Sequence, residues 1–396
     1  MRSAGLVAIG STEQAYVWSG GHYYLQHLVK CVAALPPAQA LPLHDVWWMT
    51  GPGDDPFKEV RQLLGAPVVV APPASLAGRV ARRIRRMRTG TAGARDLFRD
   101  EGIDVFFPAP PCENSGTPYV FWIPDFQHLR RPDLMSEAVR NRFAADIARL
   151  VPAAAGVVLS SFDAQKDFAT QYPQLLDRTH VVRFCSVPDD AWWRHDPLEV
   201  AQKYGLPERF VIVCNQWTRH KNHLVLLEAL RLLRERGRGD IHLVCTGSTF
   251  DYREEDYVGQ AKSFLAQHGL QPQASILGLV PRADQLALLR RAMAVAQPSM
   301  FEGWSTIVED AKTLGKPIFV SDLPVHREQL GDAQDYLDAG APLQWADALD
   351  AAWDGLHPGP DAVAEKQGWD RMEIARTACG LAFVGALKAA LPDDDG

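Results

Sequence analysis

One stretch of the sequence, residues 293–332, constrains the fold more than any other because it predicts a strand, a loop, a helix and a second strand in that order. Residues 294–296 form a short apolar run, as expected for a buried parallel strand. Apolar side chains then recur at helical spacing over 306–314, and Gly315 is a typical residue for the end of a helix. The apolar run 318–320 predicts the next buried strand. We therefore expect an α/β unit with a parallel sheet.

Two carboxylates make this unit more than a structural crossover. Glu302 precedes the predicted helix and Glu309 lies inside it, and their separation of seven positions corresponds to two helical turns, or roughly 10 Å. Gly303, Ser305 and Thr306 bring small side chains and unpaired backbone amides to the start of the helix, which is a ready site for a phosphate group. Carboxylates suit the vicinal hydroxyls of sugars. The alternative is that both acids are solvated residues of a helix end.

The surrounding motif supports the functional interpretation. Pro298 and Ser299 precede Glu302, and Gly-Lys-Pro at 315–317 follows the helix. This stretch resembles the retaining, GT-B-type glycosyltransferases of family 4, which include bacterial mannosyl-, rhamnosyl- and glucosaminyltransferases. The resemblance implies that Glu302 contacts the donor sugar and that Glu309 contacts the ribose of the nucleotide. It also implies donor contacts by Gly303, Trp304, Ser305, Thr306 and Ile307. The family's usual Phe-Gly-Leu is Trp-Ser-Thr here, which bears on the fit of the donor sugar.

Composition limits the remaining possibilities. A chain of 396 residues suits two domains, and a net charge of −7 argues against a general nucleic-acid-binding protein. No apolar run approaches the roughly 18 residues of a membrane helix, and the first ten residues are too short for a secretory signal. The six cysteines are scattered, so we expect buried thiols in a reducing cytoplasm, and no cluster of metal ligands is apparent.

A glycine pair, Gly20-Gly21, precedes a predicted helix from about His22 to Leu35. Such a pair allows a ligand to approach the backbone closely, although it is also common in ordinary turns. Family 4 enzymes carry a Gly-Gly pair in this first loop, so the resemblance implies that Gly20 and Gly21 contact the donor. The pattern is not the G-x-G-x-x-G of dinucleotide-binding proteins.

An arginine-rich segment follows, in which the arginines at 79, 82, 83, 85, 86 and 88 surround Val80, Ile84 and Met87 at helical spacing. This pattern predicts a basic amphipathic helix, either solvated or lying on an anionic membrane surface. Membrane-associated GT-B enzymes often have a comparable patch where lipid-linked acceptors dock. The Arg79–Arg88 helix is therefore a candidate for peripheral contact with the inner face of the plasma membrane.

Polar side chains follow the predicted strand 119–122. Asp125, Gln127 and His128 would lie just beyond its carboxyl end, where ligands bind in open α/β sheets. The segment resembles the I-P-D-x-Q-H-x-x-x-P segment of a family 4 subgroup. By that resemblance His128 lies near the transferred sugar, and Asp125 and Gln127 are weaker candidates for sugar or acceptor contact. For each of them the alternative is a structural role.

The second half of the chain opens with a predicted strand, 210–214, followed by Arg219 and Lys221 before an apolar-periodic helix. Two cations in this position can neutralise a departing diphosphate. Family 4 uses such a pair, and Lys221 matches its lysine. Arg219 lies nearer to the lysine than is usual and has the alternative of an exposed side chain. The family also binds the nucleotide base through the backbone after a later strand, and Val280 lies at that position. We also assign a donor contact to Asn215, which directly follows the strand 210–214.

These features predict two doubly wound Rossmann-like domains with parallel sheets, a GT-B fold. The first is an acceptor-side domain over 1–195, and the second is a nucleotide-sugar-binding domain over 196–370. A terminal helix and acidic tail over 371–396 would cross back to the first domain. The resemblance implies a metal-independent, retaining transfer of a sugar from a GDP- or UDP-sugar to a glycan or lipid-linked acceptor in surface polysaccharide or lipopolysaccharide assembly, with GDP-mannose favoured and no cofactor. Three alternatives remain open: a sugar-nucleotide epimerase, a phosphorylase, and a catalytically silent scaffold.

Overall fold

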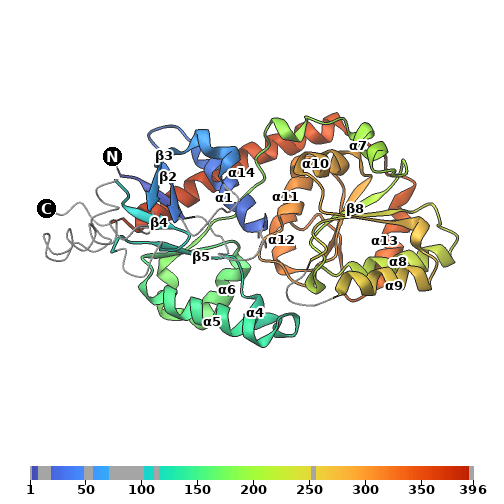
Figure 1. The fold of residues 1–396 in the computed structure, drawn as a ribbon, viewed down its shortest axis with the longest axis horizontal. Helices are drawn as coiled ribbons and strands as arrows, with labels where there is room; N and C mark the ends of the chain where they lie inside the picture. Colours follow the sequence, from blue (N-terminus) through green and yellow to red (C-terminus); the bar gives the residue numbers. More distant parts are fainter. Residues whose placement is uncertain are drawn as a thin grey trace, which may run out of the picture. The chain divides into compact units, whose positions relative to one another are not determined.

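The computed structural model describes residues 2–7, 19–48, 57–70, 102–110, 116–250 and 256–391. The chain forms two compact units (Figure 1). Unit 1 comprises Met1–Asp125, Ala144–Cys185 and Ile374–Gly396, and unit 2 comprises Phe126–Phe143 and Ser186–Glu373. The chain thus enters the main part of unit 2 at Ser186, ten residues before the predicted boundary at 195/196. That the units are separately folding domains stays a prediction.

Unit 2 is built on a six-stranded parallel sheet with the strand order β10-β9-β8-β11-β12-β13. The strands are β8 (Val211–Cys214), β9 (Leu243–Thr246), β10 (Ala274–Gly278), β11 (Ala294–Gln297), β12 (Ile318–Ser321) and β13 (Tyr336–Leu337). This is the doubly wound order, in which the chain reverses direction across the sheet between β8 and β11. Ligands of such sheets bind beyond the carboxyl ends of the strands at this switch point.

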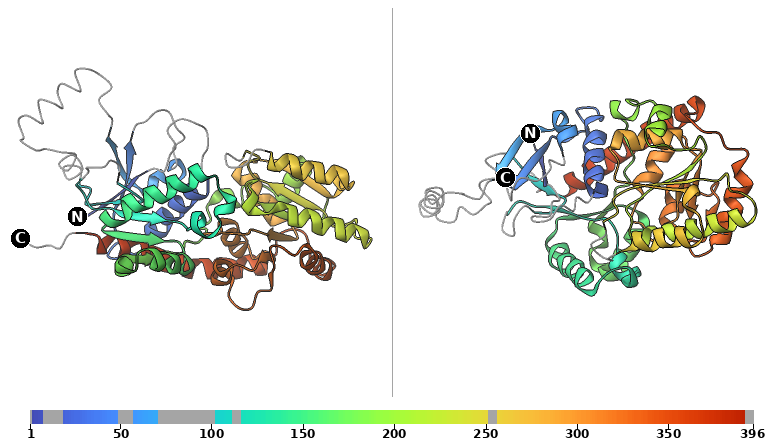
Figure 2. Two further views of the ribbon diagram at one scale, coloured as in Figure 1. Left: turned by 90° about the horizontal axis from the view of Figure 1, so that it is seen from below. Right: turned by 45° about the vertical axis from the view of Figure 1, so that its right-hand side comes forward.

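Helices cover both faces of this sheet (Figures 1 and 2). The helices of unit 2 are α4 (Gln127–Arg130), α7 (Pro197–Lys203), α8 (His223–Glu235), α9 (Tyr257–Gln267), α10 (Arg282–Arg291), α11 (Thr306–Thr313), α12 (Pro324–Leu330) and α13 (Pro342–Trp353). One core joins the strands to α8, α9 and α13, and contains the fully buried Trp217, Trp345 and Trp353. A second core joins them to α7, α10 and α11. With apolar layers on both faces, the strands are continuous apolar runs.

Unit 1 contains two further parallel sheets, of order β3-β2-β1-β4 and β5-β6-β7. Their strands are β1 (Ala4–Val7), β2 (Leu43–Trp48), β3 (Gly65–Val70), β4 (Val105–Phe107), β5 (Val120–Ile123), β6 (Gly156–Leu159) and β7 (Thr179–Val181). A parallel bridge between Phe106 and Tyr119 links the two sheets. Helices α1 (Ser19–Ala33) and α6 (Phe162–Gln171) belong to unit 1, whereas α5 (Glu137–Leu150) and α14 (Ala362–Ala389) have residues in both units.

The predicted central helix is confirmed closely. α11 spans Thr306–Thr313, and Gly315 follows it with φ of +62°, a conformation that favours glycine. The glycine pair differs from expectation, because α1 begins at Ser19 and places Gly20 and Gly21 inside its first turn instead of in the preceding loop. α14 begins at Ala362, nine residues before the terminal segment predicted over 371–396.

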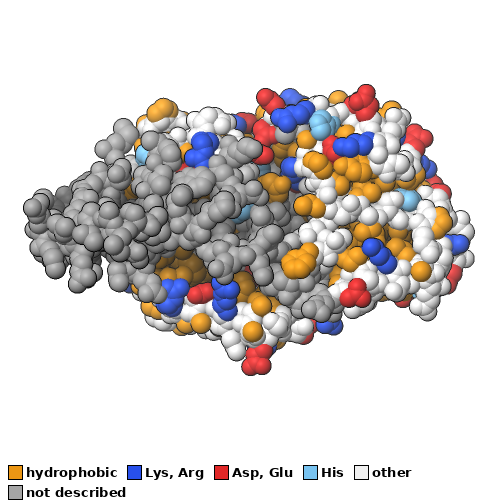
Figure 3. Space-filling view, viewed as in Figure 1, with side chains coloured by type: hydrophobic (Ala, Val, Ile, Leu, Met, Phe, Trp, Pro, Cys, Tyr) orange, Lys and Arg blue, Asp and Glu red, His pale blue; other side chains and the backbone are white. Residues whose placement is uncertain are grey.

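The predicted basic helix and the possibility of a membrane-spanning helix concern the surface of the protein. The Arg79–Arg88 segment lies outside the described residues. Within the part of the chain that the structure does describe, no helix is both long and apolar enough to cross a membrane. Basic and acidic side chains are interspersed over the part of unit 2 that faces the viewer in Figure 3.

Candidate active site

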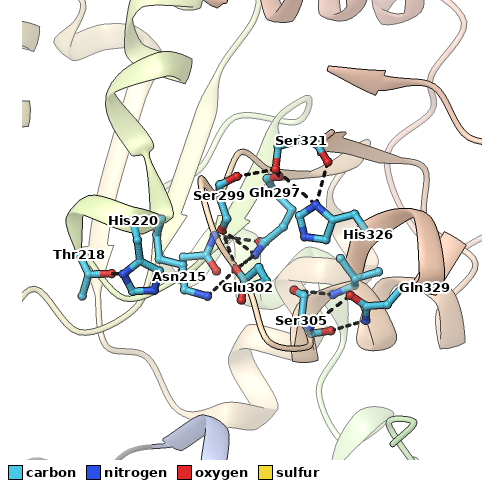
Figure 4. A network of polar contacts seen from close by, with 12 residues as sticks. Asn215, Thr218, His220, Gln297, Ser299, Glu302, Ser305, Ser321, His326 and Gln329 are labelled. Carbon is cyan, nitrogen blue, oxygen red and sulfur yellow. Dashed lines mark hydrogen bonds and ion pairs between the residues drawn. The ribbon is translucent and has the colours of Figure 1, made fainter. Parts of the chain in front are cut away.

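The candidate site lies in unit 2 at the carboxyl ends of β8 and β11, the switch point of the sheet. Asn215 is the first residue after β8 and Gln297 is the last residue of β11. The Asn215 side chain donates a hydrogen bond of 2.9 Å to Oε1 of Gln297, so the two strand ends are joined directly (Figure 4). The loops that follow these two strands carry Lys221 and Glu302 respectively.

Glu302 is held by three donors on a single oxygen. Its Oε1 accepts hydrogen bonds from Nζ of Lys221 at 2.6 Å, Nε2 of Gln297 at 2.7 Å and Oγ of Ser299 at 2.6 Å. The side chain is only 7% exposed. Among the described residues its other oxygen, Oε2, has no hydrogen-bond partner. The carboxylate is therefore fixed through one oxygen while the second can accept hydrogen bonds from a ligand.

This environment favours the charged form of Glu302. Burial by itself raises the pKa of the carboxyl group, but the positive charge of Lys221, together with the hydrogen bonds from Lys221 and Ser299, lowers the pKa below its ordinary value overall. An ionised carboxylate with a free oxygen is a strong acceptor for sugar hydroxyls.

Ser321 and His326 hold the backbone of the loop that leads to Glu302 (Figure 4). Oγ of Ser321 donates to the backbone carbonyl of Ser299 at 2.6 Å, and Nδ1 of His326 lies 2.8 Å from the carbonyl of Ser321. Because a carbonyl can only accept, this contact places a proton on Nδ1. Burial lowers the pKa of His326, against the opposing effect of the Glu302 charge. The sequence predicted neither residue.

Lys221 is positioned by a short 3₁₀ turn, Arg219–Lys221, which ends at Asn222 with a left-handed φ of 58°. The Asn222 side chain donates to the carbonyls of Pro298 at 3.0 Å and Ala339 at 2.7 Å. It thereby fixes the β8 loop against the β11 loop. The Lys221 side chain is 19% exposed, so it is not completely buried.

The second glutamate lies on α11. Glu309 is 3% exposed, and its Oε1 accepts hydrogen bonds from Lys312 at 3.0 Å and from Gln329 at 2.9 Å. Gln329 also accepts from the backbone amide of Ser305 at 3.2 Å and donates to the Ser305 carbonyl at 3.0 Å. One side chain of α12 therefore holds both the start of α11 and Glu309. Sequence reasoning missed Gln329, because nothing in the local pattern distinguishes it.

The start of α11 is open to an anion. Ser305 is its N-cap and accepts a hydrogen bond from the Val308 amide at 3.4 Å. The amides of Thr306 and Ile307, the first two residues of the helix, have no acceptor among the described residues. Two unpaired amides at a helix start suit a phosphate group.

The other predicted residues lie in different surroundings. His128 on α4 is buried between the rings of Phe126 and Phe143, at centroid distances of 5.9 and 6.5 Å, and burial lowers its pKa. Gln127 beside it is also buried. Val280, which follows β10, is half-buried.

Not all the predicted residues fall in unit 2. Gly20, Gly21 and Asp125 belong to unit 1. Within unit 2, Trp304 and Gly303 are half-buried on the loop leading into α11, and Arg219 is exposed. Of the described residues, no three His, Cys, Asp or Glu side chains group as metal ligands. Metal independence and the roles of these residues stay predictions.

Part of unit 2 matches a known protein family. Residues 199–353 match the family model described as Glycosyl transferases group 1. The matched region, called the group 1 domain from here on, makes up most of unit 2 and contains Lys221, Glu302, Glu309 and Gln329. A comparison with curated proteins finds no match.

Solved structures resemble the whole chain, beyond the group 1 domain. HepE (Alr3699) from Anabaena, in complex with UDP and glucose, superposes with a TM-score of 0.65 at 16% identity, covering 98% of this chain and 100% of that one. The sucrose-phosphate synthase tll1590 from Thermosynechococcus elongatus gives 0.61 at 12% identity, covering 97% of each chain. WaaG, a glycosyltransferase involved in lipopolysaccharide biosynthesis, gives 0.56 at 16% identity, covering 98% of each chain. The predicted GT-B fold is confirmed, and the group 1 domain supports a transferase.

Proposed function

We propose that this protein is a retaining glycosyltransferase of family 4 type that transfers a sugar from a nucleoside-diphosphate donor to a hydroxyl group of a glycan or lipid-linked acceptor. The observation that carries the proposal is the way in which the Glu302 carboxylate is held. Its carboxylate is ionised, anchored through one oxygen by Lys221 and two neutral donors, and free at the other oxygen. Such a group suits hydroxyls of the transferred sugar.

The departing diphosphate needs positive charge or hydrogen-bond donors where its charge develops. We assign this role to Lys221 and to the free amides of Thr306 and Ile307 at the start of α11. The ammonium group of a lysine has three donors, so Lys221 can bind a phosphate oxygen while it keeps its contact with Glu302. Glu309 would accept hydrogen bonds from the ribose hydroxyls of the donor.

In the proposed reaction the bond between the anomeric carbon and the diphosphate oxygen breaks. A bond from that carbon to the acceptor oxygen forms on the same face of the sugar. The proton of the acceptor hydroxyl passes to the departing phosphate oxygen, so the protein needs no carboxylate nucleophile. The donor groups of the site supply the charge stabilisation, and the reaction as proposed is metal-independent.

The identity of the substrates is part of the proposal. UDP and glucose bind to HepE, and WaaG acts in lipopolysaccharide biosynthesis. A UDP- or GDP-sugar donor and a place in surface polysaccharide or lipopolysaccharide assembly are therefore consistent with the fold. Mannose rests on the subgroup resemblance alone. Peripheral association with a membrane remains a proposal as well.

The test is release of nucleoside diphosphate from a panel of UDP-, GDP-, ADP- and dTDP-sugars, with EDTA or Mg²⁺, in the presence of simple glycoside and lipid-phosphate acceptors. We expect one nucleotide to be released at the same rate in EDTA, and the product to keep the anomeric configuration in its NMR spectrum. Absence of release from every donor, or an inverted product, would contradict the proposal.

A further inference from the structure

A pocket of about 270 Å³ lies beside the candidate site within unit 2. It is lined by Arg219, Asn222, Leu224, Tyr257, Gln260 and Met300, and includes neither Lys221 nor Glu302. The backbone amide of Met300 donates to the carbonyl of His220 at 2.8 Å, so the pocket lies where the β8 and β11 loops meet. Pockets for drug-sized ligands occupy about 300–1,000 Å³. This one therefore suits a single chemical group or one sugar unit better than a complete nucleotide sugar.

The pocket is built for negative charge. Arg219 is exposed, and among the described residues no hydrogen bond or ion pair engages its guanidinium group. The acid that feels its charge, Asp133, already accepts two hydrogen bonds from Arg131, at 3.0 and 2.8 Å. Among the residues that the structure describes, none of those lining the pocket is acidic. A guanidinium group in this state is suited to a carboxylate or a phosphate.

The amino end of α8 adds positive potential at the pocket. α8 has 13 residues and begins at His223, directly after the pocket residue Asn222. Asn222 does not cap the helix, because its side-chain amide donates to the carbonyls of Pro298 and Ala339 instead. The hydroxyl of Tyr257 accepts a long hydrogen bond of 3.4 Å from the Leu224 amide, so a neutral group and not a carboxylate meets the positive end of the helix dipole.

The rest of the wall can hold the body of a sugar. Tyr257 is 3% exposed, and with Leu224 and Met300 it forms an apolar side, while Gln260 contributes an amide. A wall that combines apolar side chains with a few polar groups is found in sites for small ligands. The combination with Arg219 favours a sugar or lipid headgroup that carries one anionic group.

Resting on the proposed function, we propose that this pocket binds an anionic group of the acceptor, a phosphate or a carboxylate, and that Arg219 is the residue that recognises it. Arg219 and Lys221 share one 3₁₀ turn, yet Lys221 contacts Glu302 while Arg219 lines the pocket. Met300, which also lines the pocket, lies only two residues before Glu302. An anion held here would place a neighbouring acceptor hydroxyl close to the transferred sugar. The sequence predicts that both cations bind the diphosphate, whereas in this proposal Lys221 binds the donor and Arg219 binds the acceptor.

Calorimetric titration with inorganic phosphate and with glucuronate tests this assignment, once the donor site is saturated with whichever nucleoside diphosphate binds. The variants are Arg219→Gln and Gln260→Leu in the pocket, with Lys262→Gln as control, because Lys262 is an exposed cation elsewhere on α9. We expect Arg219→Gln to weaken anion binding at least about 10-fold and Gln260→Leu several-fold. Nucleotide affinity should stay within about two-fold in all three variants, and Lys262→Gln should leave both affinities unchanged.

The outcomes separate the hypotheses. Preference for phosphate indicates a phosphorylated or phospholipid acceptor, and preference for glucuronate indicates an acidic sugar. Failure of the wild type to bind either anion, or binding that Arg219→Gln does not weaken, would overturn the pocket assignment. So would an equal loss of nucleotide affinity in Arg219→Gln, which would return Arg219 to the diphosphate site. If no nucleotide binds at all, the titrations are made on the protein alone, and anion binding that depends on Arg219 would stand while the proposed function fell.

Discussion

The two glutamates of the candidate site are prepared in different ways. Glu302 is fixed by donors from two different loops, since Lys221 follows β8 whereas Gln297 and Ser299 belong to the end of β11. Glu309 is fixed by Lys312, one turn along its own helix, and by Gln329 on the neighbouring α12. Both side chains are less than a tenth exposed, so burial does not distinguish them.

We expect this difference to separate an acid that acts beside the transferred sugar from an acid that binds the nucleotide. Glu302 and Lys221 can hold their relation only if β8 and β11 lie side by side, and the Asn215–Gln297 contact ties those strand ends together. Such rigid support is what a group near the reacting atoms requires. Glu309 depends on Gln329 and on Lys312 of its own helix, and Lys312 is 30% exposed and can yield to a ligand. We therefore expect changes at Glu302 to affect the rate and changes at Glu309 to affect donor affinity.

The largest expected effect comes from Glu302→Gln. Loss of the negative charge should lower kcat about 10²- to 10³-fold, comparable with removing a key polar group from other active sites, while donor affinity changes little. Steady-state kinetics with the identified donor measures it. Glu199→Gln, at an exposed position on α7, is the control and should retain full activity. A Glu302→Gln enzyme within a few-fold of the wild-type rate would remove the distinction between the two acids.

Glu309→Gln should have the opposite profile. Loss of charge-assisted hydrogen bonds to the donor is worth about 1.5–3 kcal/mol, so the donor dissociation constant should rise roughly 10- to 100-fold while kcat at saturation falls much less. Calorimetric titration with the donor, combined with kinetics, separates these quantities. A large fall in kcat at unchanged affinity would give Glu309 the role proposed for Glu302.

A smaller effect is expected from Gln329→Leu, which removes the contacts with Ser305 and Glu309. We expect donor affinity to fall about 5-fold and the free energy of unfolding to drop by about 1–3 kcal/mol, because buried polar groups lose their partners. Gln334→Leu is a matched control, since Gln334 donates to backbone carbonyls of Ile318 and Asp335 outside the site. It should lower stability without weakening donor binding. Equal donor affinity in the two variants would show that Gln329 has only a structural role.

The smallest effect concerns acid stability. Lys221 and the hydrogen bonds outweigh burial and hold the pKa of Glu302 below its ordinary value of 4.5 in the folded protein. The unfolded chain therefore binds the proton more readily, and the stabilisation is present above pH 4.5 and is lost as the pH falls through the folded-state pKa. Urea unfolding at a series of acidic pH values should show a shallower loss of stability in Glu302→Gln than in the wild type. Identical slopes would mean that the Lys221–Glu302 pair contributes nothing to acid stability.

The parts of the site that the sequence predicted are those encoded by local signals. The apolar spacing and Gly315 define α11 within a few residues, so the position of Glu309 follows from the helix period. Glu302 and Lys221 were found through motifs. Their ion pair joins residues 81 positions apart, and no local pattern encodes it.

The parts that escaped prediction depend on tertiary contacts. Gln297, Ser321, His326 and Gln329 are ordinary polar residues whose roles appear only when strand ends and α12 come together. The pocket at Arg219 escaped for the same reason, because α9 supplies Tyr257 and Gln260 from a distant segment. The sequence predicts a loop for the glycine pair, yet α1 includes both residues in its first turn, although glycine weakens helices.

The most direct test of the central claim is calorimetric titration of the wild type and of Lys221→Met with UDP-glucose and GDP-mannose in EDTA. We predict that one donor binds the wild type without metal and that Lys221→Met weakens it by at least about 10-fold, since a charge-assisted contact with the diphosphate is lost. Equal binding of that donor to the two proteins, or no binding of either donor to the wild type, would contradict a nucleotide-sugar site built around Lys221 and Glu302.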